Sequence, residues 1–156
     1  MTGAGGTGPG GTRDVGLAWR GPFTSDEVNQ LHAAAFGTRV FTRQEWDWEA
    51  LCARHSLGWV TARAAPAVLG GPPGALVGFV NVLWDGLVHA WLQDVMVGPG
   101  QVHRRIGTRL VEAATVGVRA AGCEWLHVDF DDDLAPFYLD ACGFTPARAG
   151  LKRLDD

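Results

Sequence analysis

The chain has 156 residues, a length that suits one domain with a single core and one binding or active site. Its 13 Lys and Arg residues are outnumbered by 17 Asp and Glu residues, so no basic face is evident for a polyanion. This balance argues against nucleic acid as a partner.

The cysteines and the apolar runs bear on the compartment. The cysteines are odd in number, Cys52, Cys123 and Cys142, and none forms a Cys-x-x-Cys pair, which argues against a disulfide framework or a zinc ribbon. No apolar run reaches ~18 residues, and no signal-peptide pattern opens the chain. We therefore expect a cytoplasmic protein with no membrane partner. Glycine-rich residues 1–13 are expected to form a flexible tail before a domain at residues 14–156.

The domain opens with a predicted strand and two predicted helices. A strand at residues 14–21 leads into a helix with Thr24 or Ser25 as its N-cap and Glu27 placed for a capping box. A second helix is expected at about residues 43–55, where apolar side chains recur on one face.

Strands and a long helix follow. Residues 59–65, 75–84 and 89–97 are strand-like, and their short connections indicate an antiparallel meander. After Gly100 the apolar period becomes helical, and Gly122 stands where a glycine ends a helix.

The last third predicts a strand at residues 124–130, a short helix from Leu134 to Cys142 with Asp133 as N-cap, and a final strand at residues 144–154. Because a whole helix precedes the strand at 124–130, that strand is expected to lie parallel to its neighbour. The predicted fold is a single α/β domain (α+β by some schemes) with a mixed, mostly antiparallel sheet and helices on both faces. The final strand could pair with a second copy, so a homodimer is one expectation.

The stretch from Asp94 to Ala114, DVMVGPGQVHRRIGTRLVEAA, runs from a strand through glycines and basic residues into a helix. Such a corner presents unpaired backbone N–H groups and the positive end of a helix dipole, which favours a phosphate. An ordinary solvated helix start is the alternative. A dinucleotide fingerprint fails because His103 replaces its third glycine, and a P-loop fails for lack of its lysine.

The same stretch resembles the acetyl-CoA-binding motif of the GNAT superfamily of N-acetyltransferases. In that family a strand of the form V-x-V-x-P runs into Gln/Arg-x-x-Gly-x-Gly/Ala; here VMVGP supplies the strand, and RRIGTRL places Gly107 at the final small position. APFYLDACGFTPA is similar to the family's Phe-Tyr-x-x-x-Gly-Phe stretch with one extra residue. The resemblance extends from about Asp14 to Leu154 and implies the GNAT-like fold.

Two residues depart from the family motif. Val102 stands where Gln or Arg is usual, and Arg105 where the first glycine is usual. Either the loop is displaced, or Arg105 compensates by pairing with a phosphate of CoA. Gln101, one place early, could stand in for the missing polar residue.

The resemblance implies that main-chain groups of the strand hold the pantetheine arm and that the turn holds the phosphates. The implied acetyl-CoA contacts are Val95, Met96, Val97, Val102, His103, Arg104, Arg105, Ile106, Gly107 and Thr108. Tyr138, the only tyrosine, is implied to lie near the sulfur, where its hydroxyl stabilises the departing thiolate.

The general base is left open by the sequence. Gln93 occupies a position where family members often carry an acid, and it cannot accept a proton as a base. Asp94 is the candidate we take, although strand alternation should point it to the other face and let it reach a substrate only through water. The remaining candidates are Asp85, His89, His127 and Asp129.

Other motifs are weaker. Asp129, Asp131, Asp133 and Asp140 have calcium-loop spacing, but Leu134 stands where that loop requires glycine, and we predict no metal site. Tryptophans could line an acceptor pocket; they are Trp46, Trp48 and Trp84.

The function predicted by this resemblance is direct transfer of the acetyl group of acetyl-CoA to a primary amine of a small molecule or peptide. The alternative is a non-catalytic domain that senses acyl-CoA.

Overall fold

The computed structural model describes residues 15–155, except for the side chains of residues 102–104. The predicted tail at residues 1–13 lies outside the described residues. The elements in chain order are β1 (Gly16–Trp19), α1 (Ser25–Phe36), α2 (Trp48–His55), β2 (Ser56–Arg63), β3 (Leu76–Trp84), β4 (His89–Val97), η1 (Pro99–Arg104), α3 (Ile106–Ala120), β5 (Trp125–Val128), η2 (Asp132–Leu134) and η3 (Pro136–Ala141).

The strands form one sheet in the order β1-β2-β3-β4-β5. Neighbouring strands from β1 to β4 are antiparallel, and β4 and β5 are parallel. The predicted meander and the parallel pair joined through α3 are both confirmed.

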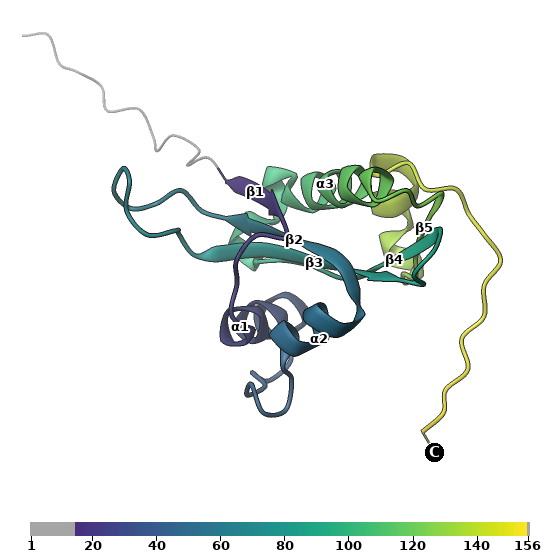
Figure 1. Ribbon diagram of the computed structural model, residues 1–156, viewed down its shortest axis with the longest axis horizontal. Coiled ribbons are helices and arrows are strands. Elements are labelled where there is room, and N and C mark those ends of the chain that lie inside the picture. Colours follow the sequence, from purple (N-terminus) through teal and green to yellow (C-terminus); the bar gives the residue numbers. More distant parts are fainter. Residues whose placement is uncertain (1–14, 156) are drawn as a thin grey trace, which may run out of the picture.

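Helices cover both faces of the sheet (Figure 1). α3 lies on one face, where Ile106 and Leu110 pack with strand residues such as Val82 in one hydrophobic cluster. α1 and α2 lie on the opposite face and bury Val28 and Trp48 in a second cluster. The predicted fold class is therefore confirmed. The candidate site lies at the side of the sheet that contains β4 and β5.

Helix caps set where α1 and α2 begin. The Thr24 side chain accepts from the Glu27 amide and the Glu27 side chain accepts from the Thr24 amide, which completes the predicted capping box. α2 begins at Trp48 rather than near residue 43, because the Asp47 carboxylate accepts from the Ala50 amide and caps the helix there.

A β-bulge interrupts β4 beside the centre of the sheet. Phe79 pairs with Met96 and Asn81 with Gln93, so one residue of β3 faces two residues of β4. Asp94, one of these two, has a positive φ of 54°. A bulge of this kind breaks the alternation of side chains between the two faces of a strand.

The segment after β5 differs from the prediction. η2 is a 3₁₀ turn and η3 a π-helix, in which the Cys142 amide donates to the Phe137 carbonyl. The predicted cap at Asp133 is wrong, because this residue lies inside η2 and makes no capping hydrogen bond.

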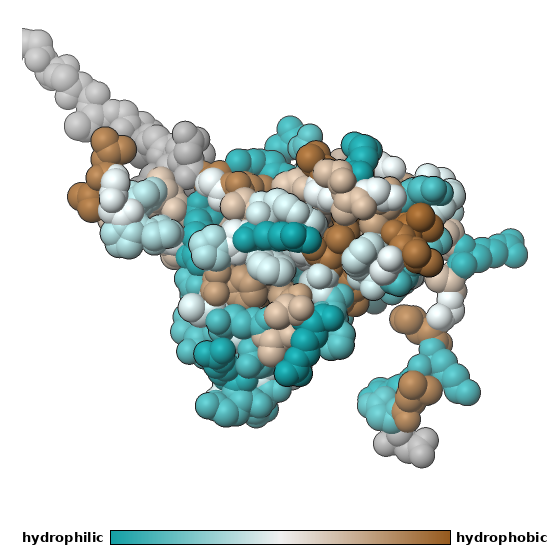
Figure 2. All heavy atoms as spheres, in the orientation of Figure 1, coloured by the Kyte–Doolittle hydropathy of each residue, from teal (hydrophilic) through white to brown (hydrophobic). Residues whose placement is uncertain are grey.

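The predicted final strand at residues 144–154 is also wrong. Residues 143–155 carry no strand. Phe144 still packs against Tyr138, whereas the segment beyond it is exposed and its end extends away from the body of the domain (Figures 1 and 2), with Leu151 at 90% and Leu154 at 87% exposure. A strand needs a neighbouring strand for its backbone hydrogen bonds, and no strand in residues 15–155 pairs with this segment.

Within residues 15–155, no helix combines the length and the apolar character needed to cross a membrane.

Candidate active site

β4 and β5 separate partway along their length. Their pairing ends where Leu92 faces Val128, whereas β4 continues to Val97. A cavity of about 730 Å³, here called the splay cavity, lies where the strands diverge, and its lining includes Asp94, Val95, Val128 and Tyr138. Along this stretch of β4, no strand in the described part of the chain pairs with the edge that faces β5, so its main-chain groups are available to a ligand.

A second cavity adjoins the first on the α1/α2 face. It has a volume of about 310 Å³ and is called the aromatic cavity. Its lining residues are Glu45, Trp46, Asp47, Trp48, Leu51, Gln93 and Asp94. Asp94 lines both cavities and therefore lies where they meet.

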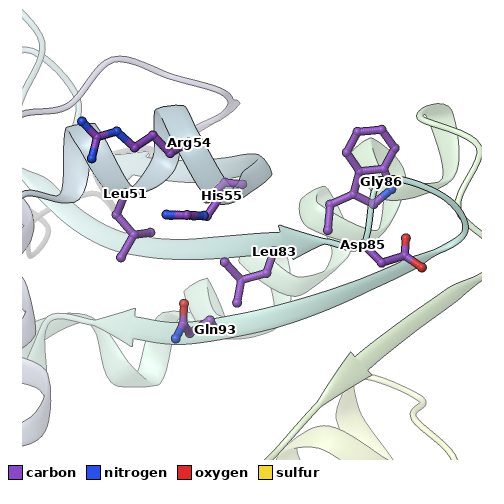
Figure 3. A pocket seen from close by; sticks show the side chains of 9 residues that line it. Leu51, Arg54, His55, Leu83, Asp85, Gly86 and Gln93 are labelled. Carbon is purple, nitrogen blue, oxygen red and sulfur yellow. The ribbon is translucent and has the colours of Figure 1, made fainter.

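A third hollow extends the aromatic cavity along α2. This outer cavity has a volume of about 610 Å³ and shares Leu51 and Gln93 with the aromatic cavity. Figure 3 shows it between α2, which contributes Arg54 and His55, and the turn at Asp85, with Gln93 on β4. The aromatic and outer cavities therefore adjoin each other at Leu51 and Gln93, and the aromatic and splay cavities adjoin each other at Asp94.

The bulge decides where Asp94 lies. Strict alternation would place its side chain on the face opposite Gln93, but both residues line the aromatic cavity. The expectation that Asp94 points to the other face is wrong, because the extra residue of the bulge changes the alternation.

The carboxyl group of Asp94 is in an environment suited to exchanging a proton. Burial raises its pKa above the ordinary value for aspartate, and the nearby charge of His32 opposes part of that shift. Among the described residues, no side chain or amide donates a hydrogen bond to it, in contrast to the other two carboxylates of the aromatic cavity. Glu45 accepts from Arg39 and Thr42, and Asp47 from Ser25 and Ala50.

Tyr138 is buried at the far side of the splay cavity. Its ring stacks on Phe130 with 4.9 Å between centroids and meets Phe137 edge-on at 4.8 Å. Burial, together with the charges of Cys142 and Asp94, raises the pKa of Tyr138 to about 12. The phenol therefore stays protonated and can act only as a hydrogen-bond donor or as a neutral acceptor near neutral pH.

The other candidate bases are placed less favourably. His89 Nδ1 and His127 Nε2 lie 2.8 Å apart, and the His127 ring stacks on Trp91. Asp85 lines the outer cavity and accepts from the amides of Leu87 and His89. Asp129 is the one other candidate base that lines the splay cavity.

The remaining predicted contacts of acetyl-CoA lie on β4 and at the start of α3. Val95 lines the splay cavity, whereas the side chains of Met96 and Ile106 are fully buried and leave only their main chain for a ligand. Val97 and Thr108 are half-buried. The side chains of the remaining predicted contacts, Val102, His103 and Arg104, lie outside the described residues.

The turn before α3 keeps a glycine-like backbone despite its arginine. Arg105 has φ 55° and ψ 23°, in the left-handed region that glycine favours. At Gly107 an added Cβ would lie 3.2 Å from the Phe137 ring, so the missing side chain lets α3 approach the element that carries Tyr138. The first amides of a helix have no partner within the helix, so a helix start such as that of α3 favours an anion.

Replacing Arg105 by glycine is expected to stabilise the fold. A residue with a Cβ costs ~1–2 kcal/mol in the left-handed region, and the extra freedom of glycine in the unfolded chain offsets ~0.4–1 kcal/mol of the gain. Arg105→Gly should therefore be about 1 kcal/mol more stable than Arg105→Ala, which keeps the strain and removes the same charge. Urea midpoints at constant m-value measure the difference, and equal midpoints would contradict it.

Two residues of the site were not found from the sequence. Leu51 separates the aromatic from the outer cavity, and Asn81 is a fully buried amide in the middle of β3 that contacts Gln93. A single polar residue within the apolar run LVGFVNVLW was the available signal for Asn81. Trp46 and Trp48 line the aromatic cavity, whereas Trp84 lines the outer one.

Among the side chains described, those of residues 15–101 and 105–155, no group of three or more His, Cys, Asp or Glu residues is arranged to bind a metal ion.

Comparison with known proteins identifies the class of this molecule. The sequence model of the Acetyltransferase (GNAT) family matches residues 25–144, which include strands β2 to β5, α3, Asp94 and Tyr138. The chain belongs to this family and is an acyltransferase of the GNAT type. The comparison with curated proteins gives no match.

Solved structures share the fold. An acetyltransferase from Trypanosoma brucei has 20% identity and a TM-score of 0.71, with 91% of this chain and 99% of that chain covered. Glucosamine-6-phosphate N-acetyltransferase from Arabidopsis thaliana has 14% identity and a TM-score of 0.63, with 90% and 99% covered. AAC(6')-Iy, in complex with the bisubstrate analogue CoA-S-monomethyl-acetylneamine, has 14% identity and a TM-score of 0.64, with 92% and 99% covered.

Proposed function

We propose that the chain transfers the acetyl group of acetyl-CoA directly to a primary amine of a small-molecule or peptide acceptor. The observation that carries this proposal is the position of Asp94, which lines both the splay and the aromatic cavities and whose carboxyl group accepts no hydrogen bond from the described residues. A base at this junction can meet an amine from one side and a thioester from the other.

Acetyl-CoA is the cosubstrate of the proposal. The main-chain groups of Val95 to Val97 would hold the pantetheine arm along the free edge of β4, as an added strand does. The first amides of α3 would hold the phosphates, with Arg105 beside them. The bisubstrate complex of AAC(6')-Iy, which contains a CoA moiety, supports this choice of cosubstrate through the shared fold.

The amine would enter through the aromatic cavity. Its nitrogen forms a bond to the thioester carbonyl carbon, the carbon–sulfur bond breaks, and the amine proton passes to Asp94. The sulfur leaves as a thiolate that accepts a hydrogen bond from Tyr138. Full proton transfer from Tyr138 is unfavourable because the pKa of its phenol, about 12, lies above the ~8.5 of an ordinary thiol.

The first test of the function measures both binding and turnover. Acetyl-CoA should raise the melting temperature, whereas NAD at equal concentration should not, because only a ligand specific to the folded state stabilises it. Thiol release from acetyl-CoA should then depend on an added primary amine. Equal shifts with both nucleotides would contradict the cosubstrate, and a specific shift with no release from any amine would favour the acyl-CoA sensor.

A further inference from the structure

We propose that Gln93 determines acceptor specificity by presenting a hydrogen-bond donor inside the aromatic cavity, so that the preferred acceptors are primary amines with an oxygen acceptor close to the nitrogen. Amino ethers, amino alcohols and amino amides belong to this class. The inference rests on the proposed acetyl transfer and adds the chemical class of the acceptor.

The orientation of Gln93 depends on Asn81 and on the buried side chains that contact Asn81. Asn81 has no exposed surface, and its Oδ1 accepts from the Ser56 hydroxyl and, at 3.7 Å, from the Cys52 thiol. Burial raises the pKa of Cys52 to about 11, so the thiol keeps its proton and acts as a donor. In this orientation the Asn81 oxygen can accept from both neighbours at once, and its NH₂ group points away from them.

The orientation of Asn81 in turn orients Gln93. With its oxygen committed to Ser56 and Cys52, Asn81 directs its Nδ2 towards β4, where it donates to Gln93 Oε1 at 3.3 Å. The oxygen of Gln93 is therefore turned to β3, as Figure 3 shows. The NH₂ group of Gln93 is then the part of the amide that is available to a ligand. No described residue accepts a hydrogen bond from that NH₂ group, and Gln93 lines both the aromatic and the outer cavities.

Among the carboxylate and amide side chains that line the aromatic cavity, two keep a group without a hydrogen-bond partner in the described part of the chain. Glu45 is paired with Arg39, and Asp47 caps α2, so partners within the protein already hold both carboxylates. Asp94 and Gln93 remain, one an acceptor for the amine proton and the other a donor. Because they are adjacent on β4 and the bulge turns both into one cavity, a single small molecule can reach both.

The neighbouring space accommodates the rest of such an acceptor. Beyond Gln93 and Leu51 the aromatic cavity continues into the outer cavity, which has a volume of about 610 Å³. An acceptor that places its amine at Asp94 and its oxygen at Gln93 can extend its other substituents there. An acceptor without the oxygen would bury the Gln93 NH₂ group without a partner, which is unfavourable.

The test compares matched amines that differ by one oxygen. The pairs are n-butylamine with 2-methoxyethylamine, and cyclohexylamine with tetrahydropyran-3-amine, in which an ether oxygen replaces a methylene group. The full chain and Gln93→Met are assayed by thiol release. The preference for the ether, expressed as a ratio of kcat/KM values, should fall roughly tenfold in Gln93→Met, which has a similar shape and no donor.

Two further variants complete the design. Gln93→Glu replaces the donor by an acceptor and should lower the ether preference at least as far as Gln93→Met does. Gln30→Met makes the same change on an exposed residue of α1 that lines neither the aromatic nor the outer cavity, and it should leave the ratio unaltered. Comparing ratios between variants cancels the different basicities of the amines.

The outcomes separate this inference from the proposed function. An ether preference that is the same in the unmodified chain and in Gln93→Met overturns the role of Gln93 while leaving acetyl transfer intact. Absence of thiol release from all four amines in the unmodified chain overturns both proposals. Loss of the ether preference in Gln93→Met, with retained turnover of the alkyl amines, supports both.

Discussion

Asp94→Asn is expected to lower kcat/KM by roughly 100-fold or more, the usual contribution of a positioned general base. Asparagine keeps the size of the side chain and tolerates the positive φ at this position, so the bulge should persist. Asp129→Asn is the matched control, because Asp129 also lines the splay cavity but lies on the exposed segment after β5. It should change kcat/KM by only a few fold if Asp94 is the base.

The pH dependence of Asp94→Asn gives a second signature. Because burial raises the pKa of Asp94, the carboxylate is lost as the pH falls through a value above the ordinary range for aspartate. The ratio of kcat/KM between the unmodified chain and Asp94→Asn should therefore rise with pH through that value and then level off. Use of one amine for both proteins cancels the ionisation of the substrate, and a ratio independent of pH would exclude Asp94 as the base.

The same substitution should stabilise the fold at neutral pH. A carboxyl group whose pKa is raised by folding holds its proton more tightly in the folded state, so its charged form costs stability above the folded pKa. That cost is absent below the unfolded pKa of ~3.9. Asp94→Asn should therefore raise the melting temperature at pH 7 but not at acidic pH. A more stable, inactive variant would separate loss of catalysis from loss of folding.

Tyr138→Phe is expected to lower kcat about 100-fold, the scale for removing one donor to a developing negative charge. The affinity for acetyl-CoA should change little, because the hydroxyl matters mainly as charge develops on sulfur. The fold should persist, since the phenylalanine ring can keep the stacking on Phe130 and the edge contact with Phe137. The measurements are the single-turnover rate and the Kd for acetyl-CoA. An unchanged single-turnover rate would mean that Tyr138 serves only in packing.

Local signals in the sequence predicted the parts of the fold that depend on neighbouring residues. The capping box of Thr24 and Glu27, the left-handed Gly122 after α3, and the short connection between β3 and β4 all involve residues close in the chain. The prediction of the final strand was wrong because a strand depends on a partner strand that its own residues do not specify.

The candidate site was predictable in composition but not in geometry. The strand, turn and helix around residues 94–107 carry a recognisable pattern, and Tyr138 follows from a second one. The side of the sheet to which Asp94 points did not follow, because the bulge arises from the pairing of β4 with β3. The left-handed backbone conformation of Arg105 could not be predicted either, because it is uncommon for arginine and is stabilised only by the surrounding structure.

The sequence by itself determined the order of the main elements, the family and the chemical groups available for catalysis, because these depend on periodicity, capping and short motifs. The tertiary structure alone decided that Asp94 lies at the junction of two cavities, that Asn81 orients Gln93, and that the last residues form no strand. The reason is that each of these depends on contacts between segments far apart in the chain, whose register and orientation are set only when the sheet and its two helical layers pack together.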